Sequence, residues 1–282
     1  MNSSYSLHNI HSVDDLSFDP AHYSWFKFGD KHYAEKFAEA LFDGFIAIYG
    51  ELLLEQDEII ILPSPYLSIP TASNFLCYYF KENLNLFLYN NNRKATIESK
   101  IYRNQTYVTD YGNLSFDERI KLISNDTYYI DKEFINGKFC LFLDDIKITG
   151  SHEYTINKIL NQYNVDGKFL FVYFAELTNK EIHPNIENHF NYFAVKGLVE
   201  IIQVVNRRHF QYNTRIIKYI LNLKENDLHQ FLQNIGEHRR DELFRLAVSN
   251  NYHQIEEYLH NLKTIKIFNN GNQSTKRTKR EH

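Results

Sequence analysis

Two adjacent acids, Asp144 and Asp145, follow an apolar run over residues 139–143 and precede a small-residue loop at residues 149–151. The run is typical of a strand buried on both faces, and the residues after the loop are typical of a helix. This order predicts two carboxylates at the carboxyl end of a strand, beside a helix N-terminus. Backbone N–H groups and the helix dipole at such a point favour a phosphate. Because carboxylates accept hydrogen bonds from sugar hydroxyls or hold hydrated Mg²⁺, one site would bind a phosphate and a ribose together.

The acid pair alone has two simpler explanations. It could hold Mg²⁺ in a flavodoxin-like receiver domain, or it could cap the helix that follows. The longer pattern, with Thr149 and Gly150 in register after the acids, favours the phosphate-binding interpretation.

The segment resembles the motif with which type I phosphoribosyltransferases bind phosphoribosyl pyrophosphate (PRPP). Asp144, Asp145, Thr149 and Gly150 fall on the family pattern. The resemblance implies that both acids hold the ribose hydroxyls and, through water, Mg²⁺, which is the implied cofactor. It also implies a loop whose amides bind the 5′-phosphate of PRPP, formed by Ile148, Thr149, Gly150, Ser151 and His152.

Three positions depart from the family pattern. Lys147 stands where an aliphatic residue is usual, and Ile148 and His152 replace small or hydroxyl-bearing residues. A phosphate held by loop amides tolerates these changes. His152 has two interpretations: a helix-start residue that bonds the phosphate loop, which we favour, or a general acid/base near the ribose.

The resemblance places the pyrophosphate-binding loop at residues 64–68, after a predicted strand over residues 58–62. Its sequence is unlike the usual Gly- or Lys-bearing versions of this loop. We expect pyrophosphate contacts from Ser64, Pro65 and Tyr66, and closure by the cations Arg93, Arg103 and Arg119.

The segment over residues 109–119 is similar to competence-protein-F-like phosphoribosyltransferases, in which a Leu and then an Arg follow a polar stretch. The ending over residues 148–153 is similar to phosphoribosyltransferases encoded in bacterial tellurium-resistance clusters. The resemblance covers about residues 20–185. It implies a phosphoribosyltransferase that binds PRPP–Mg²⁺ and transfers the phosphoribosyl group to a nitrogenous acceptor, with release of pyrophosphate.

Two other functions stay open. The same fold serves non-catalytic PRPP or nucleotide sensors, and the unusual loop at residues 64–68 favours that alternative. The helices predicted over residues 186–268 could also dock a partner protein on an α/β scaffold.

Composition sets broader limits. The 282 residues are 43% hydrophobic and 16% aromatic, which is enough for one large α/β domain with additions. The net charge of −4 would not attract nucleic acid, so we expect no such partner. Cys77 and Cys140 lie in apolar segments and predict buried thiols in a reducing compartment. The N-terminus lacks a signal pattern and no apolar run approaches a membrane span, so we expect a cytoplasmic protein without a membrane partner and leave a homodimer open.

Strands and helices alternate through the first two thirds of the chain, which predicts an α/β fold with a mostly parallel sheet of the type I phosphoribosyltransferase kind and a C-terminal helical appendage. Strands are predicted at residues 58–62, 84–89, 127–130, 139–143 and 168–175, and a helix capped by Asp30 is predicted to run to about Tyr49. The predicted parts are an irregular segment at 1–20, the α/β domain at 21–185, the helical appendage at 186–268 and a disordered basic tail at 269–282.

Overall fold

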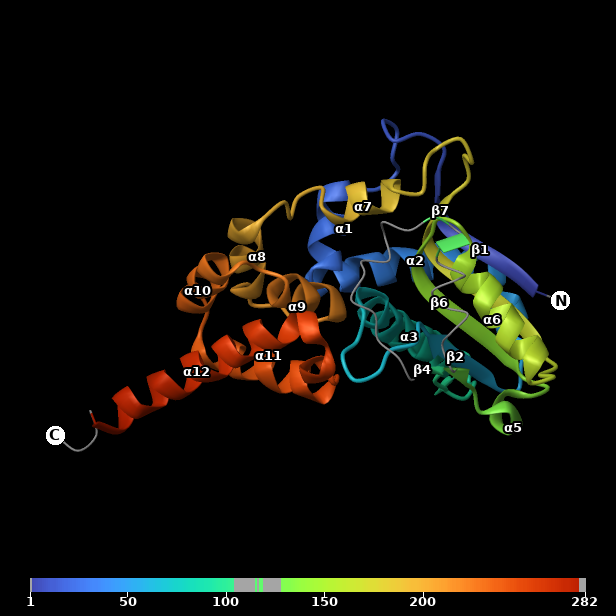
Figure 1. Ribbon diagram of the computed structural model, residues 1–282. Coiled ribbons are helices and arrows are strands. Elements are labelled where there is room, and N and C mark those ends of the chain that lie inside the picture. Colours follow the sequence, from blue (N-terminus) through green and yellow to red (C-terminus); the bar gives the residue numbers. More distant parts are fainter. Residues whose placement is uncertain (1, 104–114, 116, 119–127, 279–282) are drawn as a thin grey trace.

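The computed structural model describes residues 2–103, 115, 117–118 and 128–278 (Figure 1). A parallel sheet of five strands, in the order β1-β7-β6-β2-β3, forms the centre of the fold. The predicted α/β class with a parallel sheet is therefore confirmed. The strands are β1 (Asn2–Ile10), β2 (Ile59–Pro63), β3 (Ile97–Glu98), β6 (Phe139–Lys147) and β7 (Lys168–Leu177).

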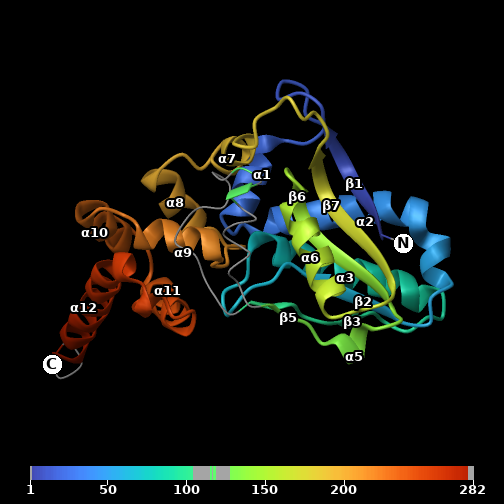
Figure 2. The same ribbon diagram turned by 45° about the vertical axis from the view of Figure 1, so that its right-hand side comes forward.

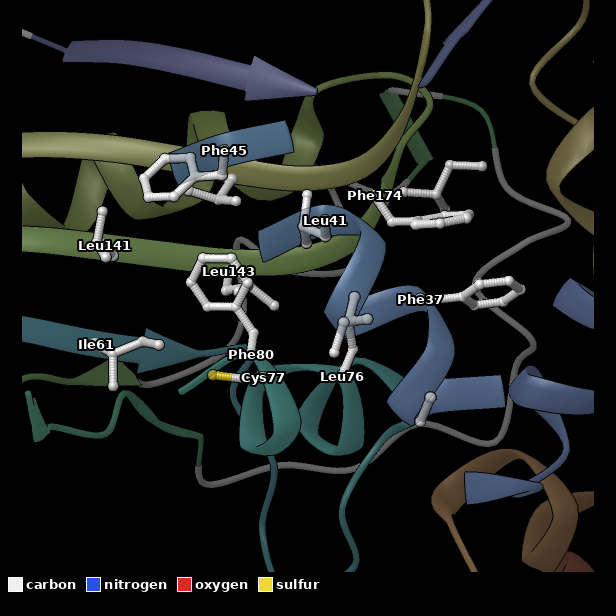
Figure 3. Packing of buried hydrophobic residues seen from close by; sticks show 14 of the residues in the cluster. Phe37, Leu41, Phe45, Ile61, Leu76, Cys77, Phe80, Leu141, Leu143 and Phe174 are labelled. Atoms are coloured by element: carbon white, nitrogen blue, oxygen red, sulfur yellow. The ribbon is translucent and has the colours of Figure 1, made fainter. Parts of the chain in front are cut away.

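Helices cover both faces of the sheet because alternate strand residues point to opposite sides. On one face, α2 (Lys31–Leu54) and α3 (Ala72–Asn90) pack on Ile61 and Leu141, as Figure 3 shows. On the other face, α6 (Ser151–Gln162) packs on the neighbouring positions. Its buried contacts include Ile60, Cys140, Phe142 and Phe171 from the strands with Ile156, Ile159 and Leu160 from α6.

Apart from the short α5 (Lys132–Ile135), the remaining helices lie beyond the carboxyl end of the sheet (Figures 1 and 2). There α1 (Pro20–Lys27) packs on α7 (Ile186–Asn191). A second core forms among the appendage helices and also takes in Phe28 and Ile69, which come from the α/β part of the chain. The appendage contains α8 (Leu198–Val205), α9 (Thr214–Leu221), α10 (Glu225–Asn234), α11 (Glu237–Ser249) and α12 (Glu256–Thr278). A small antiparallel pair joins β4 (Tyr102–Arg103) to β5 (Tyr128–Tyr129), and the short α5 (Lys132–Ile135) precedes β6.

Three predicted segments differ from the structure. Residues 2–10 form an edge strand parallel to β7 and are not irregular, because Tyr5 and Leu7 alternate with polar residues and pack on the first core. Residues 84–89 are not a strand. They continue α3, since Leu84 and Leu88 extend its buried stripe by whole turns. The tail predicted from residue 269 begins as helix, because α12 runs to Thr278, and residues 279–282 lie outside the described part.

Two other predictions, the cap of α2 and the two buried thiols, are confirmed. Asp30 caps α2 by accepting a hydrogen bond from the backbone N–H of His32 at 3.1 Å. Cys77 and Cys140 are buried free thiols. None of the helices in the described ranges combines the length and apolar character that crossing a membrane requires.

Candidate functional site

The two acids of the motif lie inside β6, which continues through Lys147. Consecutive strand residues point to opposite faces of a sheet, so Asp144 and Asp145 cannot face the same way. Their partners show the separation. Ser64 and His152 bind Asp144, whereas Tyr23 and Lys27 bind Asp145. The predicted joint role of the pair therefore divides into two.

Asp144 joins the two loops that were expected to surround PRPP. It accepts a hydrogen bond from Ser64 Oγ at 2.9 Å, and His152 Nδ1 lies 2.7 Å from its other oxygen. Ser64 comes from the loop after β2, and His152 comes from the first turn of α6. Burial would raise the pKa of Asp144, but the charge and hydrogen bond of His152, then Lys27 and Ser64, hold that pKa well below its usual range. Asp144 is thus a fixed anion at the carboxyl edge of the sheet.

Asp145 is enclosed by α1 on the other face of the sheet. Lys27 Nζ lies 2.5 Å from its Oδ2, and the Tyr23 hydroxyl donates to the same oxygen at 2.8 Å. Burial, together with the neighbouring Asp144, raises the pKa of Asp145 against the opposing effect of Lys27 and Tyr23. Because Asp145 is 5% exposed and holds two partners, the structure does not bring it to a ligand beside Asp144.

The same geometry tests the implied Mg²⁺. Asp145 does not fit a metal ligand, because its charge is already matched by Lys27 in a buried pair. Asp144 fits a contact through water, since its side chain is 17% exposed and a carboxylate has lone pairs beyond those that Ser64 and His152 use. The described residues contain no group of three His, Cys, Asp or Glu side chains that could hold a metal. Any metal here would have to arrive with its own additional ligands.

The predicted phosphate loop turns sharply into α6. Gly150 has φ +74° at the N-cap, a left-handed conformation that glycine adopts without strain. Thr149 Oγ1 donates to Ser151 Oγ at 3.0 Å and accepts from the Ser151 backbone N–H at 3.3 Å. Ile148 is buried in the first core beneath the loop. The loop therefore presents the N-terminal end of a twelve-residue helix, where N–H groups and the dipole favour an anion.

His152 leaves one nitrogen without a partner. Its Nδ1 is taken by Asp144, and its Nε2 is buried with no hydrogen-bond partner in the described part of the chain. This arrangement fixes the ring and leaves Nε2 for a further group.

Lys147 is not an independent cation. It forms ion pairs with Glu153 at 2.9 Å and with Glu176 at 3.1 Å. Glu176 also accepts from Ser6 Oγ, and Glu153 from the Tyr173 hydroxyl. Glu153 lies in the first turn of α6, and the network ties that turn to β7 and β1.

The loop after β2 is held on both sides. The Asn74 side chain donates to the carbonyl of Ser64 at 2.9 Å. Farther along, the backbone N–H groups of Ser68 and Ile69 donate to Asn250 Oδ1 of the appendage, at 3.0 and 3.1 Å. Pro65 and Tyr66 lie between these anchors and are half-buried. The structure thus brings Ser64 to Asp144 and keeps its two neighbours in the adjoining loop.

The structure does not place any of the three arginines predicted to close over pyrophosphate beside Asp144 within the described residues. Arg93 is not brought to this edge, because its guanidinium donates to the carbonyl of Gln56, which precedes β2 at the amino end of the sheet. The structure describes the backbone of Arg103, which lies in β4, but not its side chain. Arg119 lies outside the described residues. Lys100 was not predicted as a site residue, yet its Nζ lies 3.7 Å from the centroid of the Tyr66 ring.

Sequence reasoning also missed Lys27 as the partner of Asp145. The available signal was a single lysine within the aromatic stretch Trp25–Phe28, where a buried charge needs an opposite charge. Nothing local to Lys27 indicates which acid supplies it.

Comparisons with known proteins bear on this arrangement. The family model described as PRTase ComF-like matches residues 1–265, which include the sheet, α8 to α11 and the first part of α12. No curated protein matches the chain. The tellurium-resistance subgroup stays a prediction.

Proposed function

Because the chain belongs to the ComF-like phosphoribosyltransferase family, we propose that it binds PRPP–Mg²⁺ and transfers the phosphoribosyl group to a nitrogenous acceptor. One observation carries the proposal. Ser64 from the loop after β2 and His152 from the start of α6 meet on Asp144, so three chain segments converge at one edge of the sheet. Ligands of open parallel sheets bind at that edge.

Each group has a role that its position supports. The loop over residues 148–152 and the dipole of α6 bind the 5′-phosphate, with His152 Nε2 as an additional contact. Asp144 accepts hydrogen bonds from a ribose hydroxyl. The loop over residues 64–68 lies beside the pyrophosphate, and Lys100 supplies a nearby cation. These contacts hold the anomeric carbon of the ribose in place for the incoming nitrogen.

The reaction then exchanges one bond for another. The acceptor nitrogen forms a bond to the anomeric carbon as the bond from that carbon to pyrophosphate breaks, and the bonding electrons leave on the pyrophosphate oxygen. An acceptor nitrogen that carries a hydrogen releases it as a proton to solvent. The Mg²⁺ that PRPP carries would neutralise the departing charge. Lys27 and Lys147 cannot replace it, since both are already paired with carboxylates. Binding should therefore require Mg²⁺.

One observation favours a second candidate, a PRPP or nucleotide sensor without turnover. Lys27 and Tyr23 occupy Asp145, which leaves Asp144 as the one acid of the pair that faces the loops. A site with half of the expected acid pair could bind PRPP and release it unchanged.

Titration calorimetry with PRPP, with Mg²⁺ and with EDTA, tests the shared part of both candidates. The Asp144→Asn variant should lose binding, because it removes the anion while keeping the shape of the side chain. Release of pyrophosphate with a panel of nucleobases then separates the enzyme from the sensor. Absence of PRPP binding in the wild type, or undiminished binding in Asp144→Asn, would refute both candidates.

A further inference from the structure

A buried carboxamide in α7 lacks the partners that such a group needs. Asn191 is 0% exposed, and neither its Oδ1 nor its Nδ2 has a hydrogen-bond partner in the described part of the chain. Asn188, three residues earlier and therefore on the same face of the helix, also has a buried Oδ1 without a partner. Leaving such groups unsatisfied opposes folding, so natural proteins rarely keep them without a reason.

Other buried asparagines of this chain show what is usual. Asn213 donates to the carbonyl of Lys27 and accepts from the N–H of Ile216. Asn250 and Asn261 are also buried, and each makes two hydrogen bonds through its amide. Asn191 differs from all three, although it is at least as deeply buried.

The position of Asn191 connects it to the proposed site. Ser24 Oγ of α1 donates to the backbone carbonyl of Asn191 at 2.8 Å. Tyr23 and Lys27, which bind Asp145 at the end of β6, come from the same helix α1. Figures 1 and 2 both show α7 lying against α1, beside the carboxyl end of the sheet. The unpartnered amide is thus one helix away from Asp145, which adjoins the proposed ribose ligand Asp144 in β6.

The charges around α1 and α7 indicate which ligand could use this amide. Glu187 lies one turn before Asn191 and is 7% exposed. Burial raises the pKa of the Tyr23 hydroxyl, the charges of Asp145 and Glu187 raise it further, and Arg215 opposes them. Lys27 is already paired with Asp145, so it is not available to bind a second phosphate or another anion here. A neutral heterocycle can instead offer N–H groups, and a carboxamide pairs with an edge that presents one donor beside one acceptor.

We propose that Asn191, assisted by Asn188, binds the nitrogenous acceptor through a heterocycle edge that carries an adjacent hydrogen-bond donor and acceptor. This inference rests on the proposed function, because it supplies the second substrate of the same reaction. Since Asn191 is fully covered, the side chains around it must shift when the heterocycle enters, and hydrogen exchange in α7 should slow on binding.

The test uses the full chain saturated with ribose 5-phosphate, which cannot react, and titrates adenine, guanine, hypoxanthine, cytosine and uracil. Unsubstituted purine is the matched control for adenine, because it lacks the exocyclic donor. At least one base should bind the wild type. Asn191→Leu, which keeps the branched shape of the side chain but removes its polar atoms, should bind that base about 10- to 100-fold more weakly, as expected for the loss of one or two hydrogen bonds to a buried group. Its affinity for PRPP–Mg²⁺ should not change.

Stability supplies an independent readout. Asn191→Leu should unfold at a higher urea concentration than the wild type, because it removes an unsatisfied polar group. Asn213→Leu should unfold at a lower one, because it breaks two hydrogen bonds of an equally buried amide.

The outcomes separate the two proposals. If PRPP binds the wild type and none of the bases does, or if Asn191→Leu binds the base as the wild type does, the acceptor site is refuted while the proposed function stands. If Asn191→Leu is destabilised like Asn213→Leu, the amide has a structural partner such as an ordered water, and the inference is wrong. If PRPP itself fails to bind the wild type, the proposed function is refuted, and with it the inference that rests on it.

Discussion

Replacing Asp145 with Asn should damage folding, whereas replacing Asp144 with Asn should damage ligand binding. The side chains of Lys27 and Asp145 are 10% and 7% exposed, and their charged atoms are 2.5 Å apart. Asp145→Asn leaves the Lys27 ammonium buried without an anion. Breaking a buried pair in this way costs about 3–5 kcal/mol, a large part of the roughly 5–15 kcal/mol that keeps a domain folded.

A second change should restore most of the loss. Lys27→Met together with Asp145→Asn removes both charges and keeps an unbranched side chain in place of the lysine. Replacing both partners of a buried pair is close to neutral, so the double variant should lie within about 1 kcal/mol of the wild type. Urea unfolding at pH 7 of the wild type, both single variants and the double variant measures the coupling between the two positions.

The exposed pair between Lys138 and Glu58 is the matched control. Its partners are 3.0 Å apart but 26% and 39% exposed, so Glu58→Gln should cost less than about 1 kcal/mol. If Asp145→Asn costs no more than Glu58→Gln, or if Lys27→Met does not rescue it, then the buried pair is not what holds α1 on β6. PRPP binding by the folded double variant would further show that Asp145 is not a ribose ligand.

Three further predictions concern the loops around Asp144. The pKa of Asp144 lies below its unfolded value of about 3.9, so its contribution to stability is present above that pH and is lost as the pH falls through the lower folded-state pKa. The deficit in unfolding free energy of His152→Ala should therefore be larger at pH 6 than at pH 2 in urea titrations, and an equal deficit at both would contradict the assigned cause. Gly150→Ala should lower the free energy of unfolding by about 1 kcal/mol and weaken PRPP binding, because an alanine is strained at a φ of +74°. The new Cβ would meet no clash, since its nearest neighbour, Lys147 Cε, is 3.7 Å away. Asn250→Ala should lower the free energy of unfolding by about 1–3 kcal/mol and also weaken PRPP binding, whereas Asn261→Ala should lower it by a similar amount and leave binding intact. Equal effects of the two variants on the PRPP affinity measured by calorimetry would show that Asn250 does not position the loop.

Local patterns were enough to predict the centre of the fold. The apolar runs that became β2, β6 and β7 are bounded by turn residues, and Asp30 has the side chain and position of a helix cap. Residues 84–89 were wrongly predicted as a strand, because a short apolar run fits a strand and a buried helix turn equally well. Only the packing of α3 on α2 decides between them.

In the candidate site, too, the local features could be predicted from the sequence and the long-range contacts could not. Thr149, Gly150 and the two acids are neighbours in sequence, so their motif could be recognised directly. The partnership of Lys27 with Asp145 spans 118 residues, and that of Ser64 with Asp144 spans 80. Such contacts follow from how the elements pack, and no periodicity in the chain encodes them.

The parallel pairing of β1 with β7 also limits how early this part of the sheet can form while the chain is being synthesised. Ser6 and Glu176, which are hydrogen-bonded across these two strands, are 170 residues apart. At about 5–20 residues per second, a ribosome needs roughly 10–30 s to deliver the second strand after the first. Throughout that interval the first strand of the nascent chain lacks its neighbour β7, and Lys27 lacks its counter-ion until Asp145 is made, 118 residues after it. The edge of the sheet and its buried charge pair can therefore form only late, once more than half of the polypeptide has left the ribosome.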